Sequence, residues 1–105
     1  KRALELLLTG DTFSPERAYE LGLVNKVVPH DRLIPEAFAL ADRILAHSPL
    51  AAARIITAVT RGVNGSIAEG LAIEQEQFGR MAATNDIHEG LGAWIDRRAP
   101  SYSGT

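Results

Sequence analysis

The sequence predicts an all-α domain of five to six packed helices with one short extended segment. Apolar residues recur with the period of a helix along most of the 105 residues. Residue pairs that start helices, such as Ser-Pro, recur between these stretches. Aromatic residues make up only 6% of the chain and sixteen residues are alanine, so a thin core of closely packed helices is expected. The length fits one domain, residues 1–105.

In the first half of the chain, glycines, prolines and capping residues divide the helical pattern. Gly10 ends a first helix, and Ser14 followed by a proline starts a second, short one, which Gly22 ends. The stretch Leu23–Val28 is rich in β-branched residues and is expected to be extended. Pro35 is tolerated only in the first turn of the next helix. The six expected helices cover residues 1–8, 15–21, 32–46, 49–63, 67–83 and a last stretch from 85 to just before 100.

Two pairs in the second half have the spacing of a capping box. In this motif, a side chain at the helix start and one three residues later each accept a hydrogen bond from the other's backbone. Ser66 and Glu69 have this spacing, and so do Asp86 and Glu89. Residues 101–105 are expected to form a loose tail after the last helix.

Composition excludes several classes of function. The chain has no cysteine, which removes disulfides, cysteine-based zinc sites and a cysteine nucleophile. Its histidines stand alone, at His30, His47 and His88, without metal-ligand spacing. A net charge of −2 with scattered basic residues argues against a nucleic-acid surface, and no apolar run is long enough to span a membrane. We therefore expect no catalytic group, metal or cofactor within the chain, and a cytoplasmic location.

Glu74 lies on the apolar stripe of its expected helix, four residues before Phe78. A buried carboxylate is costly unless it is paired. It could serve as a general base with a raised pKa. A structural carboxylate tied to an arginine or to backbone donors is the favoured interpretation, because no second catalytic group accompanies it.

Trp94 and Arg97 are three residues apart near the end of the last helix, so they share a helix face. Trp94 would pack in the core by default, and a cation in the last turn suits the helix dipole. The alternative is a site for an anionic aromatic ligand such as an adenine nucleotide, because the indole offers a stacking face and the guanidinium binds phosphate.

Several segments together resemble a known family. The stretches LLLTG, SPERAYELGLVNKVVP and DIHEGLGAWIDRRAP, and Gly70-Leu71 with Glu74 and Phe78, follow the order and spacing of the crotonase superfamily of enoyl-CoA hydratases and isomerases. The resemblance covers essentially the whole chain and corresponds to the C-terminal helical part of that fold. A helix that already runs at Lys1, without a cap, likewise leads us to expect a piece of a longer protein, with a cloning boundary as the alternative.

The resemblance implies specific roles. The N-terminal ββα core of the family carries the oxyanion hole and the acid/base carboxylates, so this chain is expected to be non-catalytic and to mediate trimer or hexamer formation. The parent would act on an acyl-CoA substrate, most simply by hydrating a 2-enoyl-CoA. Trp94 and Arg97 match the aromatic and basic residues that contact the adenine and phosphate end of a neighbouring subunit's CoA, and Glu74 matches a position usually occupied by Glu.

Two other classes of function remain as alternatives. One is a stand-alone helical protein-interaction module without a ligand, whose apolar stripes pair with a partner. The other is a helix-turn-helix DNA binder, which lacks a basic recognition helix here. If the chain exists alone, its helices would leave apolar patches open, and we expect it to self-associate.

Overall fold

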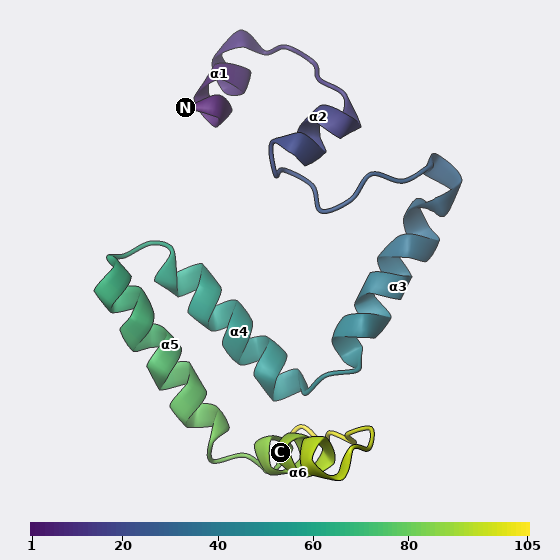
Figure 1. Cartoon of the computed structure of the whole chain (residues 1–105). Coiled ribbons are helices and arrows are strands. Elements are labelled where there is room, and N and C mark those ends of the chain that lie inside the picture. The colour runs from purple at the N-terminus through teal and green to yellow at the C-terminus, as the bar shows by residue number, and fades with distance from the viewer. The chain divides into compact units, whose positions relative to one another are not determined.

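A computed structural model describes all residues 1–105 and contains only helices and irregular segments, which confirms the all-α prediction (Figure 1). The chain forms two compact units, Lys1–Ala37 and Phe38–Thr105. The helices are α1 Arg2–Thr9, α2 Pro15–Glu20, α3 Leu33–Leu45, α4 Pro49–Gly62, α5 Ile67–Met81 and α6 Asn85–Asp96, with a short 3₁₀ helix at His30–Arg32.

The first unit shows how local signals fix helix ends. Gly10 ends α1 in the left-handed conformation, with φ of 68°, as its expected role requires. The Ser14 side chain accepts a hydrogen bond from the Arg17 backbone N–H at 3.2 Å, which caps α2. Residues 23–28 form no β-strand, because no second strand is present to pair with them. These residues form an irregular connection between α2 and the 3₁₀ helix.

Ionic contacts brace the start of α3 within this unit. Glu36 accepts hydrogen bonds from Lys26 and Arg32, and the two cations lower the pKa of the Glu36 carboxyl. Pro35 lies in the first turn of α3, where its missing N–H leaves no helical hydrogen bond unmade. The helix thus begins close to where the sequence predicts it.

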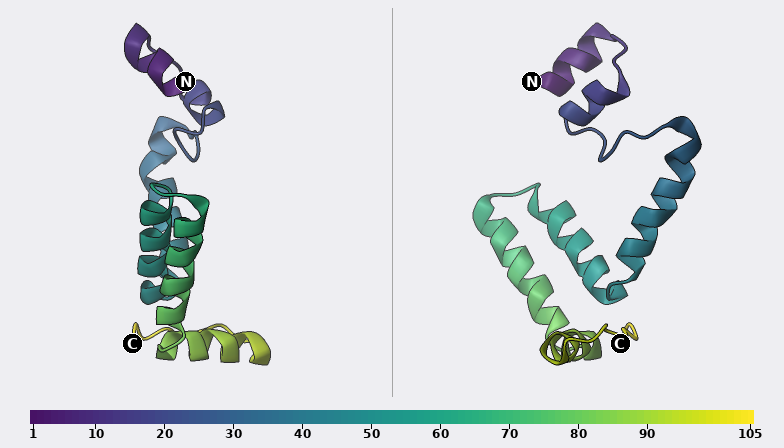
Figure 2. Two further views of the ribbon diagram at one scale, coloured as in Figure 1. Left: turned by 90° about the vertical axis from the view of Figure 1, so that its left-hand side faces the viewer. Right: turned by 45° about the vertical axis from the view of Figure 1, so that its right-hand side comes forward.

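In the second unit, α4 and α5 form a hairpin and lie side by side, while α6 runs across the lower ends of the pair (Figures 1 and 2). Ser48 caps α4, and the expected capping box of Ser66 and Glu69 forms at the start of α5. The two helix backbones approach closely where Gly62 faces Gly70. A Cβ added to Gly70 would lie 3.3 Å from the Gly62 carbonyl oxygen.

Replacing Gly70 with leucine should therefore destabilise the hairpin. The added side chain would meet backbone, which cannot rotate away, and overpacking of this kind costs about 1–3 kcal/mol. Gly79→Ala is the matched control on α5, because nothing lies within 4 Å of its added Cβ and it should stabilise by about 1 kcal/mol. Urea unfolding measures both. A Gly70→Leu protein as stable as the parent would contradict this account of the crossing.

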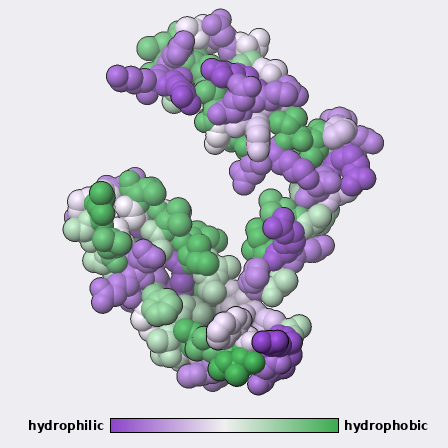
Figure 3. Space-filling model, in the orientation of Figure 1, coloured by the Kyte–Doolittle hydropathy of each residue, from purple (hydrophilic) through white to green (hydrophobic).

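Large apolar side chains remain exposed along the helices, as green areas on the surface show (Figure 3). Only Ala18 and Ala93 are buried among the apolar residues. Ile67, Leu71 and Phe78 of α5 are all more than half exposed. The apolar stripes read from the sequence exist, but within this chain most of their surface has no cover.

Candidate functional site

The last helix is anchored at its start by a buried carboxylate. Thr84, and not Asp86, caps α6: the Thr84 hydroxyl accepts a hydrogen bond from the Ile87 N–H at 3.3 Å. The capping-box prediction for Asp86 and Glu89 is therefore wrong. Asp86 lies inside the first turn and is only 2% exposed. Its position inside the helix lets its side chain reach groups distant in sequence.

Four donors converge on the Asp86 carboxylate, the weakest being the Ser103 hydroxyl at 3.5 Å. The buried Ser48 hydroxyl donates to one oxygen, and the backbone N–H groups of Ser103 and Gly104 donate to the other at 3.0 Å each. The hydrogen bond from Ser48, followed by those from the tail, lowers the pKa of the Asp86 carboxyl in spite of its desolvation. Asp86 thereby joins the start of α4, the start of α6 and the tail.

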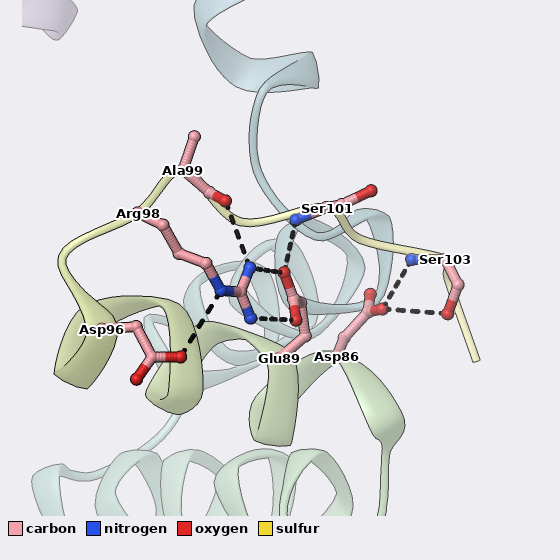
Figure 4. A network of polar contacts seen from close by, with 7 residues as sticks. All are labelled: Asp86, Glu89, Asp96, Arg98, Ala99, Ser101 and Ser103. Carbon is pink, nitrogen blue, oxygen red and sulfur yellow. Dashed lines mark hydrogen bonds and ion pairs between the residues drawn. The ribbon is translucent and has the colours of Figure 1, made fainter.

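The tail after α6 is ordered by these contacts, so the prediction of a loose tail is wrong (Figure 4). The backbone N–H groups of Asn85 and Asp86 donate to the Thr105 carbonyl oxygen at 2.8 and 3.3 Å. Tyr102 lies against Gly90, where an added Cβ would come within 3.2 Å of the Tyr102 hydroxyl. The tail thus folds back along α6.

A second carboxylate of α6 fixes the chain just beyond the helix end. The Glu89 carboxylate accepts hydrogen bonds from both terminal nitrogens of Arg98, at 2.6 and 2.8 Å (Figure 4). It also accepts one from the Ser101 backbone N–H at 2.7 Å. The guanidinium is the main cause that lowers the pKa of Glu89 to about 2, and Glu89 in turn raises the pKa of Arg98. We call Glu89, Arg98 and the Ser101 N–H the α6 clamp.

The α6 clamp should make stability depend on pH in the acid range. The folded-state pKa of Glu89, about 2, lies below the ordinary pKa of 4.5 for a glutamate, so the stabilisation from Glu89 is complete above pH 4.5 and is lost as pH falls toward 2. Thermal unfolding between pH 2 and 6 should therefore show a smaller loss of Tm on acidification in Glu89→Gln than in the parent. Equal pH slopes for the two proteins would contradict the assignment.

Trp94 and Arg97 lie exposed at the C-terminal end of α6. Trp94 is 80% exposed, so the default interpretation of a core tryptophan is wrong in this chain. Arg97 is the C-cap residue, with φ of 55° and ψ of 38°, and is the one non-glycine residue with positive φ. Its guanidinium makes no hydrogen bond or ion pair, unlike that of Arg98. Both side chains are therefore free to meet a ligand.

Glu74 is exposed and makes no hydrogen bond or ion pair, so the prediction of a buried structural carboxylate is wrong in this chain. The face of α5 that packs toward α4 is the one bearing Gly70 and Gln77, seven residues apart. Glu74 lies between these two positions on the helix surface, four residues after Gly70 and three before Gln77, and it also neighbours Leu71 and Phe78, which are exposed. Periodicity placed Glu74 on the correct side of α5, but that side is only partly covered within this chain, so position alone did not predict burial.

A groove of about 400 Å³ lies between α4, α5, α6 and the tail, and mostly apolar side chains line it. Arg54 and Glu74 border it, and so does Gln77, which is 4% exposed and whose Oε1 accepts no hydrogen bond. The sequence reasoning missed Gln77, although its spacing from Gly70 places both on one helix face.

Two further classes of site can be assessed directly. No cluster of three or more His, Asp or Glu side chains is arranged to hold a metal ion. None of the helices has the length and apolar character needed to cross a bilayer.

These features define a helical module whose last helix presents a free aromatic ring and a free cation beside a rigid polar clamp. The chain belongs to the enoyl-CoA hydratase/isomerase family, whose family model matches residues 1–105. It is 41% identical over 102 residues to a probable enoyl-CoA hydratase of Mycobacterium tuberculosis and 34% identical to 2,3-dehydroadipyl-CoA hydratase of Escherichia coli. Both alignments cover 97% of this chain and 40% of the relative.

Solved structures agree with the sequence comparison. An enoyl-CoA hydratase from Bacillus anthracis superimposes with a TM-score of 0.94 at 35% identity, over 99% of this chain and 40% of that one. An enoyl-CoA hydratase subunit from Geobacillus kaustophilus gives the same TM-score at 38% identity. The chain therefore matches part of the crotonase fold, and it spans about 40% of the length of these relatives.

Proposed function

We propose that the chain is the helical part of an enoyl-CoA hydratase that adds water to a 2-enoyl-CoA thioester. The observation that carries this proposal is the family match over the entire chain, with hydratases among its relatives. In the parent enzyme, an oxyanion hole would stabilise the thioester enolate and carboxylates would activate water. We assign those groups to the remainder of the polypeptide. The present residues serve assembly and binding, and the enzyme works in the cytoplasm.

Within this function, Trp94 and Arg97 would contact the nucleotide end of a CoA bound by a neighbouring subunit. The exposed indole would stack on the adenine, and the unpaired guanidinium would bind a phosphate. Their positions at the free end of α6 support this assignment. No other exposed aromatic side chain in the chain lies three residues from an unpaired arginine on the same helix end.

The exposed apolar faces support an assembly role. Exposed residues such as Ile67 and Phe78 would be covered by the rest of the enzyme and by its neighbours in a trimer or a dimer of trimers. The same exposure also favours the second candidate, a stand-alone helical interaction module that binds a protein partner and no ligand. Binding of CoA separates the two candidates.

The first experiment is the intact mass of the purified protein under denaturing conditions. A mass well over twice 11.3 kDa means that the catalytic part is present. Hydration of a short 2-enoyl-CoA is then followed by the loss of its conjugated absorbance, and CoA binding by calorimetry, with Trp94→Ala and Arg97→Ala beside the parent. Activity with weaker CoA binding in both variants supports the proposal. An intact protein that neither hydrates the thioester nor binds CoA would overturn it.

A further inference from the structure

Arg97 occupies a backbone conformation that an arginine rarely adopts. Left-handed φ and ψ bring its Cβ close to the following carbonyl, and glycine is the residue usually found at such a helix end. The turn is closed by a hydrogen bond from the Arg98 N–H to the Ala93 carbonyl at 3.0 Å. A strained residue persists only where its surroundings hold it.

The surroundings that hold Arg97 are the α6 clamp. Arg98, the next residue, is fixed to Glu89 through two parallel hydrogen bonds, a geometry that sets direction as well as distance. The Ser101 N–H binds the same carboxylate, so Glu89 holds the chain on the far side of the turn as well. Because the Arg97 side chain makes no polar contact, the direction in which it leaves the backbone depends on these neighbours.

We infer that Glu89 and Arg98 are positioning residues that direct the Arg97 side chain toward the nucleotide end of CoA, which Trp94 would also contact. The inference rests on the proposed function and adds the device that makes the site rigid. When the backbone of Arg97 is fixed before the ligand arrives, its side chain has fewer orientations to lose on binding. Neither Glu89 nor Arg98 needs to touch the ligand.

The test is calorimetric titration of the intact protein with free CoA. Arg97→Ala should weaken binding about ten- to a hundredfold, the effect of losing a charge-assisted contact to phosphate. Glu89→Gln should weaken it about tenfold. The double variant should bind no more weakly than Arg97→Ala, because the clamp acts only through Arg97. A purely structural ion pair would not produce this non-additivity.

Glu76→Gln is the control, since Glu76 pairs with Arg80 in an exposed ion pair on a different helix, α5. It should leave the affinity for CoA unchanged. Should Glu89→Gln fail to fold, Arg98→Lys replaces it, because lysine keeps the charge but loses the bidentate geometry; it should weaken binding severalfold.

The outcomes separate the two ideas. In one outcome, Arg97→Ala binds CoA more weakly, while Glu89→Gln and Arg98→Lys bind it like the control. That result would overturn the inference and leave the proposed function in place. Independent, additive losses would also overturn it. Unchanged binding in Arg97→Ala would overturn the proposed CoA site, and the positioning role would be lost with it.

Discussion

Asp86→Ala is expected to lower the Tm of the protein by about 5–10 °C, the largest loss of stability from any single polar group in the chain. The substitution removes the acceptor of four hydrogen bonds, which come from the hydroxyls of Ser48 and Ser103 and from the N–H groups of Ser103 and Gly104. Because Ser48 is also buried, its hydroxyl would lose its partner away from water. Thermal unfolding measures the loss, and hydrogen exchange should show faster exchange at Ser103 and Gly104.

Asp42→Ala provides the matched control. Asp42 is an exposed aspartate within α3 whose side chain makes no hydrogen bond or ion pair, so its replacement should shift Tm by little. Asp86→Asn is a milder variant, because the amide keeps one acceptor oxygen and should lose only part of the stability. If Asp86→Ala and Asp42→Ala gave the same Tm, the tail would not depend on the Asp86 carboxylate.

Helix ends were predictable because their signals are local. Ser14, Ser48 and Ser66 each accept a hydrogen bond from an N–H three residues later, so sequence spacing alone contains the geometry. The same holds for Gly10, whose left-handed conformation ends α1. Such contacts span at most four residues, and the observed helices begin or end within two residues of most of the expected limits.

Asp86 shows why spacing fails when distant groups compete. Its spacing from Glu89 fits a capping box, yet its partners lie 17 to 38 residues away in sequence. The clamp between Glu89 and Arg98 spans nine residues, a separation for which no local rule exists. Both carboxylates therefore accept hydrogen bonds from the tail. The polar composition of the tail gave no sign that it would fold back onto α6.

Glu74 shows a different limit. The apolar stripe to which it belongs is present in α5, but a stripe indicates only that a face can be covered, and not by what. Within these 105 residues that face is open, so Glu74 is exposed. For Trp94 and Arg97 the resemblance supplied a hypothesis, and their exposure keeps both side chains available for it.

Arg97→Gly is expected to stabilise the protein while it weakens CoA binding. Glycine adopts the left-handed C-cap conformation without the Cβ contact that arginine makes there, a gain of roughly 0.5–1 kcal/mol. The same substitution removes the guanidinium proposed to bind phosphate, a loss of about ten- to a hundredfold in affinity. Urea unfolding and calorimetric titration with CoA measure the two effects on one protein.

Arg97→Ala separates these two effects, because it removes the guanidinium but keeps a Cβ in the left-handed conformation. Both variants should bind CoA equally weakly, and only the glycine variant should unfold at higher urea. A glycine variant that gained stability without losing affinity would show that strain at Arg97 serves no ligand. The opposing changes would instead show that α6 retains a strained arginine, at a cost in stability, because the ligand requires its charge at that position.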